Sequence, residues 1–284
     1  MKAVWRVKPQ MAMIDVKNEI KPFMRQLLYK DAVYRTSSKT ISSFAKTFPE
    51  LTFYSQFLAI TFKASAKAKQ NRYDDVEWCQ SSFDVLRSLE SVGMCIEITG
   101  VENIKQLETP CVVIGNHMSV LETVILPSII LPIRKMTYIV KQSLLEYPVF
   151  RHIMRSRDPI AISRTNPRHD LKAVLEGGLD RLKNGISIIA FPQTTRTCSF
   201  DPTQFSTIGI KLAQKANVPI VPLALLTDAW GNGKYVKDFG KIDSSKNVHF
   251  SFGEPMWIQG RGNNEHQAVI QFINRKLQEW NNER

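Results

Sequence analysis

Short apolar runs separated by helix-like segments constrain the fold of this 284-residue chain more than any other feature. Residues 112–114, 186–191 and 218–226 are almost wholly apolar, and polar residues follow each run closely. Strands that are apolar throughout, rather than alternating, are typical of a sheet that is buried on both faces. The sequence therefore predicts an α/β fold with a mixed, largely parallel sheet covered by helices.

Two regions are expected along the chain. Residues 1–93 are predicted to form a basic helical extension, and residues 94–284 the α/β domain. Most of the net charge of +12 belongs to the extension, because residues 1–73 contain 14 Lys and Arg against 4 Asp and Glu. Such a region suits an anionic membrane surface or nucleic acid, and it is also the usual pattern of a solvated helical face. No nucleic-acid partner is expected, since no Gly-rich phosphate loop, zinc spacing or aromatic RNA-binding motif accompanies the charge.

Residues 51–69 are predicted to form an amphipathic helix within this extension. Aromatic residues recur near helical spacing at Phe53, Phe57 and Phe62, and the lysines Lys67 and Lys69 follow them. A helix with an aromatic face and a basic end can lie in a bilayer interface. The same face can equally pack against the body of the protein, because an apolar stripe is first of all a core signal. The extension is therefore a candidate membrane-docking region, with both readings open.

The compartment follows from what the chain lacks. Residues 1–30 contain no apolar core of a secretory signal, and the longest stretch without a charged residue is 109–121, which has 13 residues. A membrane-spanning helix needs about 20 mostly apolar residues. The four cysteines show no zinc or redox spacing, which favours a reducing cytoplasm and no bound metal. We expect a cytoplasmic protein attached peripherally to the cytoplasmic face of a membrane.

A histidine and a carboxylate follow the apolar run 112–114. His117 and Glu122 lie five positions apart, where α/β proteins place their chemistry, between the end of a strand and the start of a helix. A histidine there can act as a general base, and a carboxylate can orient it. Ser119 and Glu122 also fit a helix capping box, in which Glu122 would serve helix stability alone. The pair by itself leaves both interpretations open.

Arginines follow two further predicted strands. Arg164 follows the run 160–162 after one intervening residue, Ser163, and Arg196 follows the run 186–191. The planar guanidinium is well shaped to bind a phosphate, and Arg164 also precedes a predicted helix N-terminus, which favours anions. The two arginines are predicted to meet around a phosphate, and the plain alternative is that each pairs with a surface carboxylate.

Four blocks in this order resemble the glycerolipid acyltransferase family, of the bacterial lysophosphatidate (1-acylglycerol-3-phosphate) acyltransferase type. Residues 116–122 (Asn-His-Met-Ser-Val-Leu-Glu) resemble its Asn-His-x-Ser-x-x-Asp block. Residues 160–164 resemble its second block, an apolar pair followed by Arg, and residues 191–197 (Phe-Pro-Gln-Thr-Thr-Arg-Thr) resemble its Phe-Pro-Glu-Gly-Thr-Arg-Ser block. Residues 218–222 match its Val-Pro-Ile-Val-Pro block.

Two departures from the family pattern stand out. Glu122 replaces the aspartate of the first block, which keeps the charge but lengthens its reach. Gln193 and Thr194 replace the Glu-Gly of the third block. The first change removes a negative charge, and the second places a side chain where the family has glycine. The acceptor pocket is therefore the part in which this chain is expected to differ from the family.

The resemblance implies transfer of a fatty acyl group from a thioester, either acyl-CoA or an acyl carrier protein, to the hydroxyl of a lysophospholipid. His117 would be the catalytic base and Glu122 its orienting anion. Arg164 and Arg196 would hold the acceptor's phosphate, while Gln193 and Thr195 would contact its polar oxygens. No bound cofactor or metal is implied, and the partners are the membrane lipid surface, the lysophospholipid acceptor and the acyl donor. The acceptor is expected to be 1-acylglycerol 3-phosphate, and the alternatives are another lysolipid or a non-catalytic lipid-binding protein.

Overall fold

A computed structural model describes residues 33–37, 40–193, 195–234 and 236–283. Eight strands form one sheet in the order β1-β2-β8-β7-β3-β6-β4-β5. The five strands from β7 to β5 are parallel to one another, whereas β8 runs antiparallel to β7 and β1 antiparallel to β2. The strands are β1 (Val33–Arg35), β2 (Ile96–Thr99), β3 (Val112–Gly115), β4 (Met136–Lys141), β5 (Ile160–Ile162), β6 (Ser187–Ala190), β7 (Ile220–Leu226) and β8 (Val248–Phe252). The predicted mixed, largely parallel sheet is confirmed.

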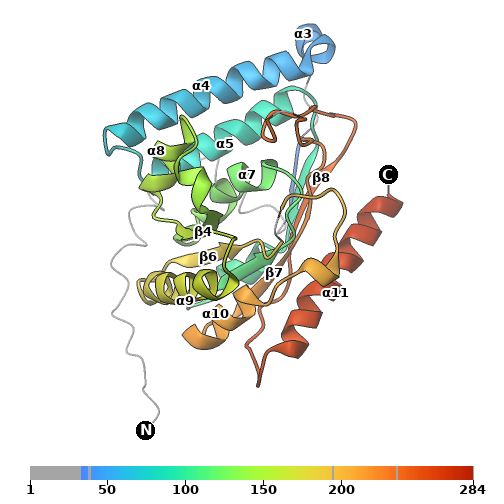
Figure 1. The fold of residues 1–284 in the computed structure, drawn as a ribbon. Helices are drawn as coiled ribbons and strands as arrows, with labels where there is room; N and C mark the ends of the chain where they lie inside the picture. Colours follow the sequence, from blue (N-terminus) through green and yellow to red (C-terminus); the bar gives the residue numbers. More distant parts are fainter. Residues whose placement is uncertain (1–32, 38–39, 194, 235, 284) are drawn as a thin grey trace.

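Helices cover both faces of the sheet (Figure 1). Successive residues of β3 show why: Val113 belongs to one buried cluster, with α4, α5 and α7, whereas Val112 and Ile114 belong to the other, with α9, α10 and α11. The helices are α3 (Ser43–Thr47), α4 (Pro49–Lys69), α5 (Asp75–Ser91), α6 (Glu102–Lys105), α7 (Leu121–Ile130), α8 (Phe150–Ser156), α9 (Pro167–Lys183), α10 (Ile208–Ala216) and α11 (Asn263–Asn282), with 3-10 turns at η1 (Gln142–Leu145) and η2 (Pro202–Gln204).

The described part of the N-terminal extension is mostly helical, as expected, but it also contributes a strand. β1 pairs with β2 at the edge of the main sheet, and the helical prediction for residues 1–93 is wrong there. The buried carboxylate of Glu90 on α5 explains this attachment, because it accepts hydrogen bonds from the hydroxyls of Tyr34 and Thr36. The predicted helical and charged residues at 1–32 lie outside the described residues.

The helix at residues 51–69 forms as α4, and its aromatic side chains divide between two faces. Phe53 and Phe57 are fully buried against Trp230, whereas Phe62 is 57% exposed. In Figure 1, α4 forms the outer layer above α5. One face of this helix thus packs on the protein, as the core interpretation predicts, and another face remains apolar and exposed. Docking to a membrane stays a prediction. Among the described helices, none has the length and apolar character needed to cross a bilayer.

The apolar segment after the first block is more helical than its prolines suggest, because α7 runs through Pro127. A proline at this position removes the N–H that would bind the carbonyl of Thr123 one turn earlier. The hydroxyl of Tyr138, on the neighbouring β4, donates to that carbonyl at 3.0 Å instead. The tertiary contact therefore replaces the helical hydrogen bond that the sequence alone shows to be lost.

The helix expected after Arg164 forms as α9, which begins after Asn166 and is continuous through its Gly177-Gly178 pair. The Asn166 side chain caps it by accepting from the N–H groups of Arg168 and His169. A Cβ at Gly178 would lie only 2.6 Å from a methyl group of Leu212 on α10. The glycine is therefore a site of close helix packing rather than a break.

Candidate active site

The sheet order places the predicted site residues at three strand ends. His117 follows β3, and the third block follows β6, which is the direct neighbour of β3. Arg164 follows β5, and β4 lies between β5 and β6. Strands in a sheet lie about 4.8 Å apart, so β5 is about 10 Å from β6. The third block is therefore the immediate neighbour of His117, whereas Arg164 lies further along the same edge.

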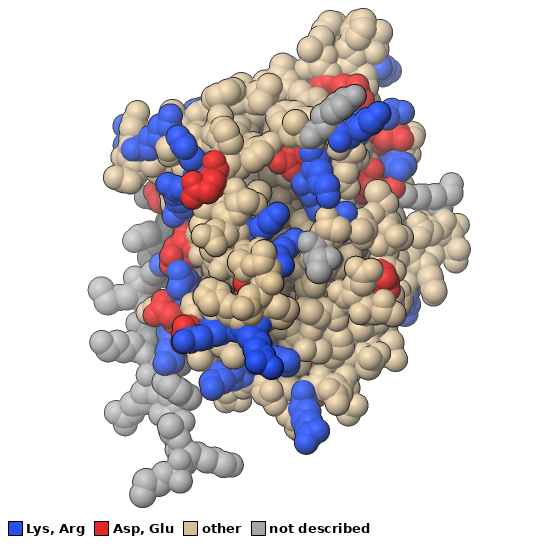
Figure 2. Space-filling view, viewed as in Figure 1, with Lys and Arg blue, Asp and Glu red and all other residues tan. Residues whose placement is uncertain are grey.

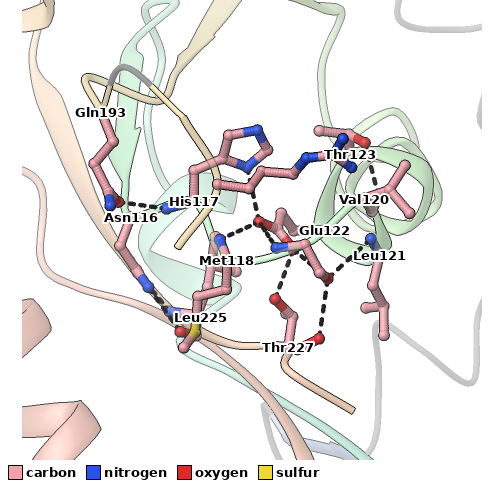
Figure 3. A network of polar contacts seen from close by, with 12 residues as sticks. Asn116, His117, Met118, Val120, Leu121, Glu122, Thr123, Gln193, Leu225 and Thr227 are labelled. Atoms are coloured by element: carbon pink, nitrogen blue, oxygen red, sulfur yellow. Dashed lines mark hydrogen bonds and ion pairs between the residues drawn. The ribbon is translucent and has the colours of Figure 1, made fainter. Parts of the chain in front are cut away.

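His117 and Glu122 are in direct contact. The Nδ1 of His117 lies 2.8 Å from Oε1 of Glu122, as Figure 3 shows, and the opposite edge of the ring points away from the carboxylate. Glu122 is completely buried, whereas the His117 side chain remains 14% exposed. Because an ionised carboxylate can only accept, Nδ1 must carry a proton, and in the neutral form of the ring Nε2 then keeps its lone pair. This arrangement leaves the outward nitrogen able to take a proton from a bound hydroxyl.

Glu122 also serves the capping role that was the alternative interpretation. Its Oε1 accepts from the backbone N–H groups of Met118 and Ser119, at 2.7 and 3.0 Å. The Ser119 hydroxyl in turn accepts from the N–H of Leu121 at 3.1 Å, at the start of α7. One carboxylate therefore fixes the turn before α7 and binds the histidine at the same time. The two roles are compatible, and the activity of a variant at Glu122 decides whether the contact with His117 also matters for catalysis.

The pKa of Glu122 lies below its usual value. Burial acts in the opposite direction, because it penalises the charged form. The hydrogen bond and charge of His117 and the hydrogen bond from Thr227 outweigh this penalty. Glu122 is therefore an anion at neutral pH, as an orienting partner of a protonated imidazole must be.

The third block encloses His117 from the side of β6. The backbone N–H of His117 donates to Oε1 of Gln193 at 2.6 Å, and the N–H of Thr197 donates to the carbonyl of His117 at 3.0 Å. The Phe191 ring stacks on the imidazole, with centroids 4.6 Å apart and planes inclined by 7°. These contacts fix both the backbone and the ring plane of the histidine.

Gln193 was predicted to contact the acceptor, and the structure gives its side chain protein partners. Besides accepting from His117, its Nε2 donates to the hydroxyl of Thr197 at 3.0 Å, and the residue is buried. To contact the acceptor, the Gln193 side chain would have to exchange its hydrogen bonds with His117 and Thr197 for bonds to the ligand. The substitution of Gln for Glu therefore affects the loop around His117 in addition to any effect on a ligand.

Arg196 and Thr195 meet a loop that follows β7. Nη1 of Arg196 lies 2.7 Å from Oδ1 of Asp238, and both side chains are mostly buried. The ammonium group of Lys237 donates to the Thr195 hydroxyl at 3.0 Å. The alternative raised for the arginines, pairing with a carboxylate, thus holds for Arg196. Figure 2 shows Lys and Arg side chains in and around a hollow near the middle of this face of the molecule.

Arg164 adopts a backbone conformation that is unusual for a residue with a side chain, with φ of 61°. The carboxylate of Asp170, in the first turn of α9, accepts from the N–H of Arg164 at 2.7 Å and from the N–H and hydroxyl of Ser163. Such a conformation persists only where its surroundings hold it, and it occurs often at ligand sites. Asp170 therefore holds the backbone of Arg164 in this conformation, just after the end of β5.

Several residues of the site were not singled out from the sequence. Thr227 follows the apolar run 218–226, so the strand-end rule that found His117 and the two arginines also indicates Thr227. The stacking of Phe191 and the pairing of Asp238 with Arg196 have no comparable signal in the sequence. Asn116 belongs to the first block, and its side-chain amide bonds both backbone groups of Leu225 at 2.8 and 2.9 Å, joining the end of β3 to β7.

Comparisons with known proteins agree with this geometry. Residues 95–226 match the family model described as Acyltransferase. The chain is 29% identical over 203 residues to a 1-acyl-sn-glycerol-3-phosphate acyltransferase of Pseudomonas aeruginosa, covering 72% of this chain and 73% of that one. It is 30% identical over 138 residues to a chloroplastic protein of the same name from Brassica napus, of which it spans only 38%.

A solved structure extends the similarity to the fold. The crystal structure of the 1-acyl-sn-glycerophosphate (LPA) acyltransferase PlsC from Thermotoga maritima superposes with a TM-score of 0.60 at 20% identity, covering 82% of this chain and 95% of that one. The matched region of the family model runs from β2 to the end of β7 and includes His117, Glu122 and Arg196. Residues 95–226 of this chain therefore match the acyltransferase family model, and the chain shares the fold of the Thermotoga maritima protein.

Proposed function

We propose that the protein is an O-acyltransferase that moves a fatty acyl group from a thioester to the free hydroxyl of 1-acylglycerol 3-phosphate, giving phosphatidic acid. The single observation that carries this proposal is the 2.8 Å contact of His117 Nδ1 with the buried, ionised Glu122. The match of residues 95–226 to the acyltransferase family model, and relatives named for this reaction, support the same substrates. The thioester donor is acyl-CoA or an acyl carrier protein.

The reaction follows from the state of the imidazole. The acceptor hydroxyl gives its proton to Nε2 of His117 while its oxygen attacks the thioester carbonyl carbon. Glu122 stabilises the imidazolium that forms, as the aspartate does in a serine-protease triad. When the tetrahedral intermediate collapses, the carbon–sulfur bond breaks and the thiol leaves with the proton returned by His117. No protein nucleophile is required, because the acceptor hydroxyl takes that part.

Thiol release from liposomes containing a panel of lysolipids tests this proposal. Wild-type protein should release thiol with 1-acylglycerol 3-phosphate, and His117→Ala should abolish release while leaving the circular dichroism spectrum unchanged. His152→Ala, which changes a histidine on α8, is the matched control and should behave as wild type. Near-wild-type activity in His117→Ala would remove the histidine from the base role. If another lysolipid gives faster thiol release, that lysolipid replaces 1-acylglycerol 3-phosphate as the proposed acceptor. Lipid binding without thiol release would favour a non-catalytic lipid-binding protein.

A membrane surface is the proposed partner of α3 and α4. Large apolar side chains recur along these helices with helical spacing and are between 38% and 61% exposed: Phe44, Phe48, Leu51, Leu58 and Phe62. Exposed apolar stripes of this kind, with lysines nearby, are typical of helices that lie in a bilayer interface. Lys46, Lys63 and Lys69 are exposed on the same two helices. The proposed side is the cytoplasmic one, which is consistent with four free cysteines.

Co-sedimentation of the full chain with anionic vesicles tests the membrane partner. The triple variant Phe44→Ser, Phe48→Ser and Phe62→Ser should lose most of its binding. Trp257→Ser is a matched control, because this aromatic residue is 50% exposed and lies near the start of β7, beside Met256. Equal binding by the triple variant and the control would exclude α3 and α4 as the docking surface.

A further inference from the structure

The two oxygens of the Glu122 carboxylate have different partners (Figure 3). Oε1 accepts from Nδ1 of His117 and from the backbone N–H groups of the turn before α7. Oε2 accepts from the hydroxyl of Thr227 at 2.6 Å, the hydroxyl of Ser119 lies 3.0 Å from it, and the backbone N–H of Ser119 is shared between the two oxygens, at 3.2 Å from Oε2. Among the side chains, His117 therefore contacts one oxygen, and the hydroxyls of Thr227 and Ser119 contact the other.

Thr227 is the stronger of the two hydroxyl donors. The single hydroxyl proton of Ser119 has two acceptors within reach, because the carbonyl oxygen of Thr227 lies 2.9 Å away. The carboxylate of Glu122 is ionised, so the Thr227 hydroxyl must be the donor in its 2.6 Å contact. Hydrogen bonds to an ionised acceptor are shorter and stronger than neutral ones, as this distance illustrates.

Thr227 reaches Glu122 from a distant part of the chain. It is the first residue after β7, it lies 105 positions beyond Glu122, and its exposure is 0%. Glutamate has one more rotatable bond than the aspartate at the corresponding family position, so holding its carboxylate in one orientation costs more side-chain entropy. A fixed donor on the far oxygen removes that freedom and leaves the near oxygen directed at His117.

We infer that Thr227 is a positioning residue for the general base: its hydroxyl holds the longer carboxylate of Glu122 so that Oε1 stays on Nδ1 of His117. This inference rests on the proposed function only for its effect on turnover. The orientation of the histidine proton is a property of the folded protein itself and is measurable without any substrate. Thr227 touches no reacting atom, and it acts through Glu122.

Substitutions at Thr227 separate its hydroxyl from its volume. Thr227→Val keeps the shape and removes the donor, and it should lower kcat about tenfold to a hundredfold, the usual effect of losing an orienting partner, with KM for the acceptor within about twofold. Thr227→Ser restores the donor and should recover kcat to within about threefold of wild type. Thr137→Val is the matched control, because Thr137 is also buried and its hydroxyl also donates, to the Arg157 carbonyl at 2.9 Å.

The tautomer of the His117 ring, measured by NMR, distinguishes a positioning role from a purely structural one, because a purely structural role of Thr227 would leave it unchanged. Long-range ¹H–¹⁵N correlation of the His117 ring should show a proton on Nδ1 in wild type, in Thr227→Ser and in Thr137→Val. Thr227→Val should show a mixture of the two neutral tautomers, because Glu122 then lacks the donor that fixes its Oε2 from β7 and is held only by the turn before α7. If Thr227→Val does not fold, Thr227→Ala takes its place.

Three outcomes would overturn the inference: unchanged kcat in Thr227→Val, equal loss in the Val and Ser variants, or an unchanged tautomer. Equal loss would mean that the side chain acts by packing alone. If wild-type protein shows no acyl transfer at all, the proposed function fails, while the tautomer measurement still decides the role of Thr227.

Discussion

The guanidinium of Arg196 lies 2.7 Å from the carboxylate of Asp238, and the two side chains are only 16% and 15% exposed. Asp238 comes from the loop after β7, so the arginine that was expected to hold a phosphate already has an anionic partner. An acceptor phosphate at Arg196 must therefore share the guanidinium with Asp238 or displace it. Lys237, next to Asp238, adds a cation that contacts Thr195.

Removing the charge of Asp238 should strengthen acceptor binding. In Asp238→Asn the phosphate no longer competes with a carboxylate, and if this pair is worth about 1 kcal/mol, the upper end of the range for exposed ion pairs, the change is about fivefold. We expect KM for 1-acylglycerol 3-phosphate to fall by about that factor, measured by thiol release at varied acceptor. Asp158→Asn, which breaks a distant pair with Arg181, is the control. A higher KM in Asp238→Asn would show instead that the carboxylate holds Arg196 in its binding position.

Removal of Arg196 should have the opposite effect. Arg196→Ala takes away charge-assisted hydrogen bonds worth about 1.5–3 kcal/mol, so KM for the phosphate acceptor should rise about tenfold to a hundredfold with a smaller change in kcat. Arg275→Ala on α11 serves as the control. An acceptor without a phosphate monoester should show little difference between wild type and Arg196→Ala. Unchanged kinetics with the phosphate acceptor would place its headgroup elsewhere.

Loss of the Asp170 carboxylate should release Arg164 from its positive-φ conformation. Burial opposes the ionisation of Asp170, yet hydrogen bonds from Ser163 and Arg164 hold its pKa below the usual value. Asp170→Asn keeps the shape but weakens these bonds, so KM for the acceptor should rise severalfold with kcat nearly unchanged. Asp180→Asn, on an exposed position of the same helix, is the control. The role of Asp170 would be refuted by acceptor kinetics in Asp170→Asn that match those of the control.

A Glu122→Gln variant separates capping from catalysis. Glutamine can still accept from the backbone of the turn before α7, so a role in capping alone predicts a stability loss of about 1 kcal/mol with activity preserved. If the Glu122 anion stabilises the protonated His117, its removal should lower kcat strongly, since the corresponding change in a serine-protease triad lowers kcat about 10⁴-fold. We expect a loss of at least about a hundredfold in kcat. Full activity in Glu122→Gln would mean that Glu122 serves only to cap α7.

The same substitution predicts a change in how stability depends on pH. The folded-state pKa of Glu122 lies below its usual value of 4.5, so the ionised group stabilises the fold above that value. This contribution is lost as the pH falls through the lowered pKa. Urea unfolding between pH 7 and pH 3 should therefore show the wild type losing more free energy of unfolding than Glu122→Gln. Glu176→Gln, an exposed change on α9, should keep the wild-type slope. Parallel curves for all three proteins would contradict the expectation.

The sequence predicted the features that depend on local pattern. Fully apolar strands followed by polar residues identified the sheet and the three strand ends that carry the candidate site, because a residue's place after a strand can be read directly from the chain. Tertiary pairings were not accessible in this way. Asp238 reaches Arg196, and β1 joins β2, only because distant segments fold together. The spacing of Glu122 indicated the two roles only as alternatives, and the structure was needed to show that one carboxylate contacts both the turn before α7 and the histidine.

Pro127 shows how tertiary structure restores what local rules exclude, and a double-mutant cycle tests it. In wild type, Tyr138→Phe leaves the carbonyl of Thr123 without its donor, since residue 127 has no N–H, and this should cost about 1–3 kcal/mol of unfolding free energy. In the Pro127→Ala background the new N–H can bind that carbonyl, so the same change should cost about 1 kcal/mol less. Urea denaturation of the four proteins measures this coupling, with Tyr147→Phe as a control in both backgrounds. An equal cost of Tyr138→Phe in both backgrounds would mean that the tyrosine hydroxyl does not compensate for the proline.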